Sequence, residues 1–490
     1  MCLCLTSSIL ILLSFFMVVL IRKVSLIFGD VTFDQLLFHA MLPKGILDAG
    51  LVQKFLHIGW ALRSFLAIGL AIGLMVALLS SRRLGHVVAR GIQWLSEHLV
   101  GLALLCSLTL FLLVSVWFSH SFQIVSSIVM LFENSAVLDE FLRQPELHEF
   151  RQVDASGILL DKTKRPNLIL IMSESLEATF RNEGIFEQNL LLELESLRKA
   201  GDVCEEHMEV RGSHFTIASM YSLHYGLPLL YLQSMDGEPT KKNVFAGKAV
   251  SIFDVLDAHG YNILHLQGTS LKFAAQGELF AHLRHARCIG LENFAEDEYP
   301  VRQSWGLYDQ DLLDRARKEA VGLARDGQPF ALSIQTIDNH FGNSLQPGEQ
   351  ACYGDARDII RLQSRLIADF VTWCRQQDFA ENTVIAIIGD HHMMVKNIGR
   401  ITLPEKKDRR VFNCILNAKS QIPMKRHLAS EFDFAPTLLD ALSFQWPDFS
   451  LGLGRSLYRE SPTILDTLGD DGWKREVRKG FKSYAEMIRK

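Results

Sequence analysis

The chain has 490 residues, of which 48% are hydrophobic, and a formal net charge of −5. A chain of this length can bury at least one large core, and two or three domains are expected. The net charge and a pI near 6.4 argue against nucleic-acid binding, because nucleic-acid-binding domains carry a basic stripe and residues 161–460 have none.

Three runs without a charged residue lie in the N-terminal quarter of the chain, at 1–21, 64–81 and 99–119. Each run is long enough to cross the hydrocarbon core of a bilayer. The first could instead be a signal peptide, but it lacks a basic start and a small-residue cleavage site, so we expect it to be retained. We therefore predict a membrane anchor over residues 1–135, with about three transmembrane helices at approximately 4–21, 58–81 and 99–119.

The basic residues around these runs predict the orientation of the anchor. Arg82, Arg83 and Arg90 lie between the second and third runs, whereas no Lys or Arg follows the third run until Arg143. The positive-inside rule places the arginine loop in the cytoplasm, so the remainder of the chain is predicted on the outer side of the membrane. Two basic residues after the first run then lie outside, where they can snorkel to lipid headgroups.

From residue 161 to residue 460 the apolar runs shorten to strand length and alternate with amphipathic stretches, which predicts a globular domain. A linker is predicted before this domain at 136–160, and a basic tail is predicted after it at 461–490. Buried strands are predicted at 167–172, 262–266, 330–337 and 383–388, and helices at 190–199, 252–259, 312–324 and 359–377. Parallel βαβ connections are the simplest topology for this alternation. The predicted class is therefore an α/β domain with a mostly parallel sheet.

Polar residues follow each predicted strand, namely Ser173-Glu174-Ser175, Gln267-Gly268, Asp338-Asn339-His340 and Gly389-Asp390-His391-His392. In open parallel sheets, ligands bind beyond the carboxyl ends of the strands. We therefore expect these four groups to converge at one edge of the sheet and to carry the chemistry.

Glu174, Asp390 and His391 together supply two carboxylates and an imidazole. This set suits a hard or borderline divalent cation, such as Mn²⁺ or Mg²⁺, better than a zinc ion held by thiolates. The segment 211–220 is predicted as a loop that enters a helix with Thr216 at its N-terminus, where a metal-activated hydroxyl could attack phosphorus. Taken alone, Thr216 is also explained as an N-cap, and His391-His392 as a structural pair.

Four segments together carry a family resemblance: residues 167–175, the Thr216 segment running into Gly226-Leu227-Pro228, Asn339-His340-Phe341 and Gly389-Asp390-His391. Their combination resembles the lipoteichoic acid synthase and phosphoglycerol transferase branch of the alkaline phosphatase–sulfatase superfamily. The resemblance implies an alkaline-phosphatase-like three-layer αβα sandwich and one bound metal ion, Mn²⁺ or alternatively Mg²⁺. By resemblance, the ligands are Glu174, Thr216, Asp390 and His391, and Thr216 also forms a covalent phosphoglycerol intermediate.

Finer matches are similar to the phosphoglycerol transferases that decorate osmoregulated periplasmic glucans. They are Gln267-Gly268 with Leu271-Lys272-Phe273-Ala274, then Trp305-Gly306-Leu307-Tyr308-Asp309, and Leu451-Gly452-Leu453-Gly454-Arg455-Ser456. This resemblance implies substrate contacts through Gln267, Lys272, Trp305 and His340, and a proton-transfer or phosphate-contact role in catalysis for His340. Packing or surface roles are the open alternative for His340, Lys272 and Gln267.

The function that the resemblance implies is transfer of phosphoglycerol from the membrane lipid phosphatidylglycerol to a cell-envelope glycan, with release of diacylglycerol. The expected location is the bacterial inner membrane, as a multi-pass protein with its catalytic domain on the periplasmic or extracellular side. A formylglycine sulfatase is disfavoured, because the chain has no Cys-x-Pro-x-Arg motif. The remaining alternatives are a phosphoethanolamine transferase, another phosphodiesterase or sulfatase-type hydrolase of the same fold, and a catalytically silent membrane scaffold.

Overall fold

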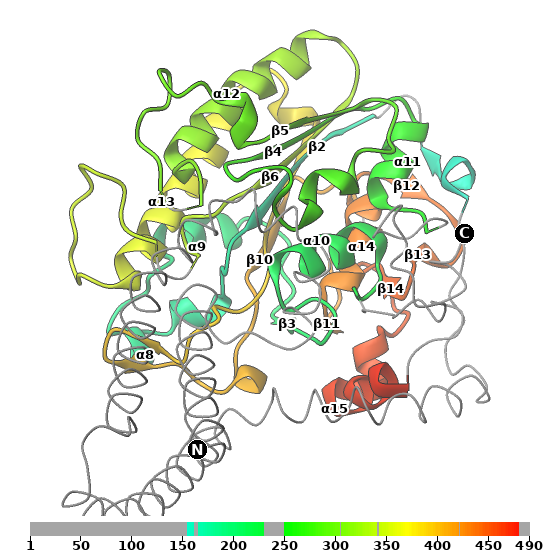
Figure 1. Cartoon of the computed structure of the whole chain (residues 1–490). Helices are drawn as coiled ribbons and strands as arrows, with labels where there is room; N and C mark the ends of the chain where they lie inside the picture. The colour runs from blue at the N-terminus through cyan, green and yellow to red at the C-terminus, as the bar shows by residue number, and fades with distance from the viewer. Residues whose placement is uncertain are drawn as a thin grey trace, which may run out of the picture. The chain divides into compact units, whose positions relative to one another are not determined.

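A six-stranded sheet forms the centre of the domain in the computed structural model (Figure 1). The structure describes residues 154–160, 165–229, 249–303, 305–340, 343–420 and 422–479. Neighbouring strands are parallel except for the first pair in the sheet. Across the sheet the order is β10 (Asn413–Leu416), β7 (Thr383–Gly389), β2 (Asn167–Ser173), β6 (Phe330–Gln335), β4 (Asn262–Gln267) and β5 (Ala286–Ile289). This order and direction confirm the predicted α/β fold with a mostly parallel sheet.

The four predicted strands are all present as β2, β4, β6 and β7. Three of them are buried along their whole length, and β4 is buried except at its first residue. A strand covered on both faces has apolar residues at odd and even positions alike, so it is a continuous apolar run in the sequence. β6 ends two residues earlier than predicted, because Ile337 begins a turn in which its carbonyl accepts the backbone N–H of His340 at 2.9 Å.

Helices pack on both faces of the sheet and make the predicted three layers (Figure 1). One face is covered by α9 (Leu192–Arg198), α12 (Asp309–Arg325) and α13 (Ala356–Cys374), and the other by α10 (Thr216–Tyr225), α11 (Ile252–Ala258) and α14 (Phe434–Ala441). The four predicted helices correspond to α9, α11, α12 and α13, with ends shifted by a few residues. Thr216 begins α10, as predicted.

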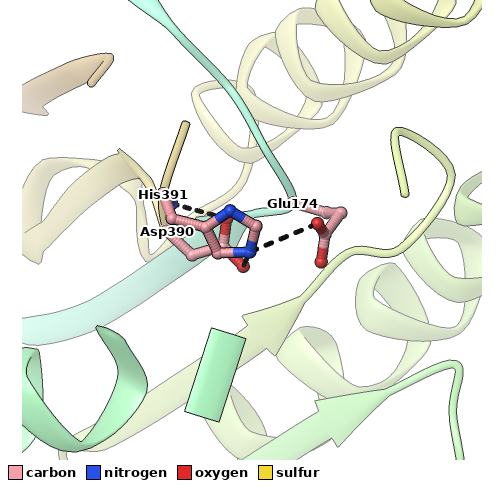
Figure 2. Close-up of side chains that lie close together, drawn as sticks. All are labelled: Glu174, Asp390 and His391. Carbon is pink, nitrogen blue, oxygen red and sulfur yellow. Dashed lines mark hydrogen bonds and ion pairs between the residues drawn. The ribbon is translucent and has the colours of Figure 1, made fainter. Parts of the chain in front are cut away.

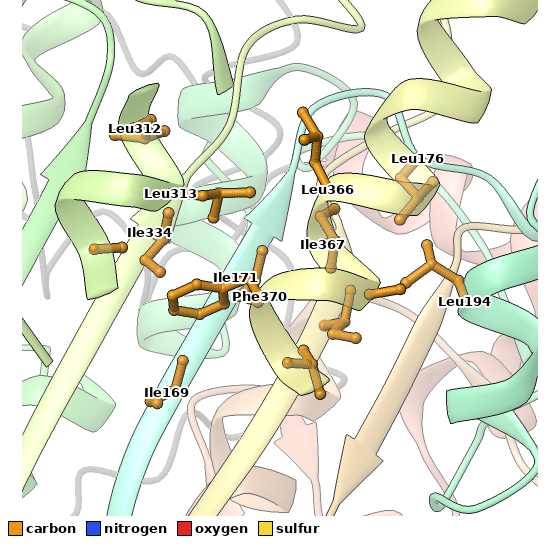
Figure 3. Packing of buried hydrophobic residues seen from close by; sticks show 14 of the residues in the cluster. Ile169, Ile171, Leu176, Leu194, Leu312, Leu313, Ile334, Leu366, Ile367 and Phe370 are labelled. Atoms are coloured by element: carbon orange, nitrogen blue, oxygen red, sulfur yellow. The ribbon is translucent and has the colours of Figure 1, made fainter. Parts of the chain in front are cut away.

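A large hydrophobic core lies between the sheet and the first of these helical layers (Figure 3). Its buried side chains come from β2 (Ile169, Ile171), β6 (Ile334), α12 (Leu312, Leu313), α13 (Leu366, Ile367, Phe370) and α9 (Leu194). Full burial of one such side chain contributes about 1.5–3 kcal/mol. The core therefore gives the strand ends of the sheet a rigid support.

Shorter elements surround the sheet. In the described residues, two-stranded pairs are formed by β1 (Leu159–Leu160) with β12 (Phe444–Gln445), β3 (Glu206–His207) with β11 (Leu428–Ala429), β8 (Asn397–Ile398) with β9 (Ile401–Thr402), and β13 (Ser450–Leu451) with β14 (Gly454–Arg455). One short helix, α8 (Glu183–Phe186), and 3₁₀ turns complete the connections; the turns include η2 (Ala178–Arg181), η3 (Phe273–Leu279), η6 (Lys406–Asp408) and η7 (Glu431–Asp433).

The last described helix, α15 (Ile464–Lys479), belongs to the segment predicted as a basic tail. The chain changes direction at Gly469, where φ is 65°. Beyond this kink Trp473 is fully buried against Phe432, with ring centres 5.2 Å apart, and its Nε1–H donates to the backbone oxygen of Arg211 at 3.0 Å. This part of the tail is therefore packed on the domain.

The membrane anchor predicted over residues 1–135, and the linker up to residue 153, lie outside the described residues. In the part of the chain that the structure describes, no helix combines the length and the apolar character needed to cross a membrane.

Candidate active site

The ends of β2 and β7 bring the predicted metal ligands together. Ser173 pairs with Gly389 at the last position of the two parallel strands, so Glu174 and Asp390 leave the sheet side by side. His391 follows directly (Figure 2). Its Nε2 lies 3.5 Å from Glu174 Oε1 and 3.6 Å from Asp390 Oδ2, and all three side chains are buried. The predicted convergence of these two strand ends is confirmed.

Ser175 holds both carboxylates in place. Its hydroxyl donates to Glu174 Oε1 and its backbone N–H donates to Asp390 Oδ1, each at 2.7 Å. The backbone of Ser175 has a φ of 50°, in the left-handed region, which costs about 1 kcal/mol or more for a residue with a side chain. In the sequence Ser175 is recognisable only as part of a polar turn, so this role was not predicted.

The ring of His391 is oriented by the backbone. Its Nδ1 lies 2.8 Å from the carbonyl oxygen of His392, and a carbonyl can only accept. Nδ1 therefore carries a proton, and in the neutral ring the lone pair is on Nε2, which faces the two carboxylates. An imidazole held in this way is prepared to coordinate a cation through Nε2.

Thr216 lies against the same three groups. Its Oγ1 is 3.3 Å from Glu174 Oε2 and 3.3 Å from His391 Nε2. Phe215 is the N-cap of α10 and Thr216 is the first helical residue, so the hydroxyl does not cap the helix. The side chain is also only partly buried. The N-cap explanation for Thr216 therefore does not hold, and the hydroxyl stands at the positive end of a helix beside the candidate metal ligands.

The loop that precedes Thr216 is anchored by residues from the C-terminal part of the domain. The hydroxyl of Ser213 donates to the buried carboxylate of Glu431 in η7. Two residues earlier, the carbonyl of Arg211 accepts the indole N–H of Trp473. These contacts fix the loop from two sides, and so they fix the position of Thr216.

The electrostatics of the site indicate unbalanced negative charge. Burial, followed by the charge of Asp390, raises the pKa of Glu174 to about 8. Burial likewise raises the pKa of Asp390. For His391 burial acts in the opposite direction, but the carboxylates of Asp390 and Glu174 outweigh it and raise the pKa to about 9. The protein alone therefore holds extra protons here, and a bound divalent cation would replace them.

The positions of the donor atoms also fit a metal ion. Glu174, Asp390 and His391 each offer one ligand atom, and these atoms all lie within 4.8 Å of one another. Ligand atoms bonded at about 2.1 Å to one metal ion lie about 3.0 Å apart at neighbouring octahedral positions and about 3.4 Å apart in a tetrahedral site. The separations of 3.3–3.6 Å that link His391, the carboxylates and Thr216 Oγ1 lie close to these values, so small side-chain movements would bring the atoms onto one ion.

A second layer of contacts holds the loop after β7, and sequence reasoning missed all of it. Glu209 accepts the backbone N–H of His392 at 2.7 Å. Glu177 accepts the backbone N–H of Met393 at 2.9 Å and forms a buried ion pair with Arg409. Such second-layer contacts orient metal ligands. Their partners are far apart in sequence, so no local motif revealed them.

Two of the predicted substrate-binding residues contact each other. The ring centres of Trp305 and His340 lie 4.6 Å apart, and those of Phe273 and Trp305 lie 5.3 Å apart. Lys272 precedes Phe273 and is exposed. Lys272 follows β4, Trp305 follows β5 and His340 follows β6, and the carboxyl ends of these parallel strands share one edge of the sheet with those of β2 and β7. The structure therefore groups Lys272, Trp305 and His340 at the predicted edge.

Gln267, which was predicted to contact substrate, is occupied within its own loop. Its side chain is fully buried, its Nε2 donates to Thr269 Oγ1 at 2.8 Å and to Ser270 O at 2.9 Å, and its Oε1 lies 2.8 Å from His265 Nε2. In this arrangement Gln267 organises the loop that leads to Lys272, and both N–H groups of its amide are used within the protein.

A pair of buried acids supports the turn before His340. The two carboxylate oxygens of Asp309 accept the backbone N–H groups of Ile337 at 2.8 Å and Asp338 at 3.1 Å. Asp338 Oδ1 accepts the side-chain amide of Gln303, whereas its Oδ2 is buried with no hydrogen-bond partner among the described residues. Burial raises the pKa of Asp309 to about 7, and burial with the charge of Asp309 raises the pKa of Asp338 well above its usual value.

This acid pair predicts a pH dependence of stability. Carboxyl groups whose pKa is raised on folding stabilise the protein fully at low pH, and this contribution is lost as the pH rises through their folded pKa values. The free energy of unfolding should therefore fall between about pH 4 and pH 8. Asp338→Asn should weaken this dependence and raise the free energy of unfolding at pH 8 by about 1 kcal/mol. Urea unfolding at pH 5 and pH 8 measures the free energy of unfolding, with Asp326→Asn, at an exposed position, as the control. An unchanged pH dependence in Asp338→Asn would contradict the prediction.

Comparison with protein families gives a match to the family described as Sulfatase over residues 166–444. Phosphoglycerol transferase I of Xanthomonas campestris pv. campestris (strain B100) is 28% identical over 360 residues, which cover 67% of this chain and 49% of that protein. Phosphoglycerol transferase I of Salmonella paratyphi B is 28% identical over 307 residues, which cover 59% of this chain and 38% of that protein. The chain thus spans about half the length of these relatives or less.

Among solved structures, the lipoteichoic acid synthase LtaP from Listeria monocytogenes aligns with a TM-score of 0.49 and 14% sequence identity. The alignment covers 62% of this chain and 80% of that one.

Proposed function

Because this chain belongs to the sulfatase family, whose pattern covers residues 166–444, we propose that it is a metal-dependent phosphoglycerol transferase of the cell envelope. The proposed donor is the membrane lipid phosphatidylglycerol, and the proposed acceptor is a hydroxyl group of an envelope glycan. The similarity to proteins named phosphoglycerol transferase I supports the choice of transferred group.

The observation that carries this proposal is the position of the Thr216 hydroxyl. Its Oγ1 lies 3.3 Å from both Glu174 Oε2 and His391 Nε2, at the start of α10. The buried carboxylates beside it carry negative charge that a bound cation would neutralise. A divalent cation, proposed as Mn²⁺ with Mg²⁺ as the alternative, would be held by Glu174, Thr216, Asp390 and His391 and would supply Lewis-acid charge that favours the alkoxide of Thr216. A threonine in this setting is a nucleophile rather than a structural hydroxyl.

In the first proposed step, Thr216 Oγ1 loses its proton to a base of the site, for which His340 is proposed, and attacks the phosphorus of phosphatidylglycerol. The bond between phosphorus and the diacylglycerol oxygen breaks, that oxygen takes up a proton, and diacylglycerol leaves. Phosphoglycerol remains as an ester of Thr216. The N-terminus of α10 favours the negative charge of the phosphate, because the backbone N–H groups of the first helical turn point toward it.

In the second step, a glycan hydroxyl attacks the same phosphorus and loses its proton as the Thr216 ester bond breaks. Thr216 regains a proton, and phosphoglycerol is carried away on the glycan. His340 is proposed to move the proton or to contact the phosphate, because an imidazole titrates near neutral pH and its ring is positioned by Trp305. The exposed ammonium group of Lys272 is proposed to neutralise phosphate charge.

The proposed location follows from the donor. Residues 1–135 are proposed as a multi-pass anchor in the bacterial inner membrane, and residues 161–460 as the catalytic domain on its periplasmic or extracellular side. An anchored domain meets the phosphodiester of phosphatidylglycerol at the membrane surface, without extracting the lipid.

The test is a single-turnover experiment on the full chain in detergent with Mn²⁺ and phosphatidylglycerol. We expect release of diacylglycerol and a mass increase of one phosphoglycerol group on the peptide that contains Thr216, measured by mass spectrometry. Phosphatidylethanolamine is the matched control lipid. An adduct formed from phosphatidylethanolamine alone would make the protein a phosphoethanolamine transferase, and no adduct or diacylglycerol from either lipid would refute the covalent transfer.

A further inference from the structure

We propose that His207 and Glu431 are positioning residues for the transfer reaction, which hold Thr216 in place through Ser213; this inference rests on the proposed function. His207 belongs to β3, Glu431 to η7 and Ser213 to the loop before α10. All three side chains are fully buried, and none of them belongs to the candidate metal centre. We refer to Ser213, Glu431 and His207 as the polar cluster.

Ser213 connects the polar cluster to the nucleophile. Its hydroxyl donates to Glu431 Oε2, and its backbone N–H donates to Val210 O at 3.1 Å. The carbonyl of the preceding residue, Gly212, accepts the hydroxyl of Ser222 in α10 at 3.0 Å. Thr216 follows Ser213 by only three residues, so a displacement of Ser213 would also displace Thr216.

Glu431 depends on His207 for its electrostatic balance. Among the described residues, no Lys or Arg forms an ion pair with the Glu431 carboxylate. His207 Nε2 lies 3.2 Å from Glu431 Oε1, which is an ion-pair distance, although the ring is not oriented for a linear hydrogen bond. A carboxylate in the interior needs such a partner. His207 therefore holds one oxygen of Glu431, and the other oxygen is left to accept from Ser213.

The ring of His207 is itself fixed. Its residue pairs with Ala429 of β11, and its carbonyl accepts the backbone N–H of Val411 at 2.9 Å. The imidazole packs on Phe434, with ring centres 4.6 Å apart. Nδ1 has no hydrogen-bond partner among the described residues, so the proton of a neutral ring belongs on Nε2, which faces the carboxylate.

The same segment also supports the metal ligands. Glu209 lies two residues after His207 and accepts the backbone N–H of His392 at 2.7 Å. The carbonyl of His392 in turn orients the ring of His391. Residues 207–209 therefore support the loop of the nucleophile at one position and the loop of the metal ligands at another. The separation of 3.3 Å between Thr216 Oγ1 and His391 Nε2 depends on both supports.

Polar residues at these buried positions favour a role in placement. A buried ion pair is a weak source of stability, and apolar side chains of similar volume often stabilise a fold equally well. Polar contacts, however, are directional and restrict position more closely than apolar packing does. A displacement of about 1 Å at a reacting group can reduce the rate by about 10²-fold. The polar cluster accordingly serves the position of the Thr216 hydroxyl.

The variant His207→Phe tests the proposal in the full chain in detergent. Phenylalanine keeps a ring against Phe434 and removes the nitrogen that faces Glu431. The maximal rate of diacylglycerol release from phosphatidylglycerol should fall at least about tenfold, whereas the KM for the lipid and the metal bound per chain should stay unchanged. His207→Gln, whose amide N–H can replace the ring N–H, should keep the rate within about threefold of the unchanged protein.

Hydrogen exchange gives a second readout, which needs no donor lipid. In His207→Phe the backbone N–H groups of residues 211–220 should exchange at least about tenfold faster, because the loop loses one of its two anchors. Exchange in α11 should not change. Ser213→Ala removes only the hydroxyl that reaches Glu431 and should reproduce both effects, which keeps the test valid if His207→Phe does not fold. The double variant should exchange no faster than either single variant.

His224→Phe is the matched control, because it also removes a buried imidazole. His224 lies in α10, and its ring centre is 4.7 Å from that of Phe253 and 5.2 Å from that of Phe280. It is not part of the polar cluster. This control should therefore keep the rate, the KM and the exchange of residues 211–220.

Unchanged exchange of residues 211–220 in both His207→Phe and Ser213→Ala would overturn the proposal. Faster exchange with an undiminished rate would overturn it as well, because the position of the loop would then not affect transfer. An equal loss of rate in His207→Gln and His207→Phe would reduce His207 to a packing residue. If the unchanged protein releases no diacylglycerol, the proposed donor fails, and hydrogen exchange alone then decides whether the polar cluster holds the loop.

Discussion

Replacement of Thr216 by alanine is expected to reduce phosphoglycerol transfer by at least about 10³-fold, because the variant lacks the proposed nucleophile. The fold should remain, since Thr216 is partly exposed and does not cap α10. Diacylglycerol release from phosphatidylglycerol measures the rate, and mass spectrometry measures the covalent adduct, which should be absent. Metal content should change far less than activity, because Glu174, Asp390 and His391 remain.

Thr216→Ser is the matched control, because it retains the hydroxyl and removes only a methyl group. It should form the adduct and keep a measurable part of the activity. Full turnover by Thr216→Ala would show that phosphoglycerol passes directly from donor to acceptor, or that another residue is the nucleophile.

Asp390→Asn is expected to abolish metal binding and transfer together. The asparagine oxygen can still accept the backbone N–H groups of Ser175 and His391, which Asp390 Oδ1 accepts at 2.7 and 2.8 Å. An amide nitrogen, which has no lone pair to offer a cation, replaces the oxygen that faces His391. Bound metal, measured by elemental mass spectrometry, should fall from about one ion per chain to near zero, with a loss of activity of about 10³-fold.

Asp433→Asn is the control for this experiment. Asp433 is another fully buried carboxylate, and its oxygens accept backbone N–H groups of Ser430 and Arg455. It is not part of the candidate metal centre, so its variant should retain the ion. Stoichiometric metal in Asp390→Asn would remove Asp390 from the ligand set, and absence of metal from the unchanged protein would favour a catalytically silent scaffold.

Length and burial together decided which strands the sequence could predict. β2, β6 and β7 are buried along six or seven residues and form continuous apolar runs. The two strands at the edges of the sheet have four residues each and were not predicted. β5 is an Ala-Arg-Cys-Ile segment with only its last residue buried, whereas β10 is buried throughout but is too short to give a distinct apolar run.

The residues of the candidate site also divide into those that the sequence could predict and those that it could not. Glu174, Asp390 and His391 were predictable, because each directly follows a recognisable strand and parallel strand ends converge. The contacts that position them depend on packing between distant segments. Glu431 lies 218 positions from Ser213, which it anchors, and the role of Ser175 depends on a left-handed backbone conformation. No local pattern encodes either feature.

The motifs of the family resemblance also contact one another. The backbone N–H of Leu307 donates to Gly268 O at 3.1 Å, and that of Leu453 donates to Gly226 O at 2.8 Å. Gly226 ends α10 with a φ of 65°, and a Cβ atom there would lie 2.1 Å from Leu451 O. Packing alone therefore accounts for part of these motifs, as it does for Gln267, whose amide is hydrogen-bonded within its own loop.

The hydrogen bond from Trp473 to Arg211, in the loop before Thr216, makes the candidate site depend on a late-synthesised part of the chain. Its two partners are 262 positions apart, and Trp473 is the later of them to leave the ribosome. A chain that stops between Glu431 and Trp473 would contain every predicted metal ligand and the proposed nucleophile, yet its Thr216 loop would lack one of its two anchors. The contact that completes the support of this loop can therefore form only after nearly the whole domain has been synthesised.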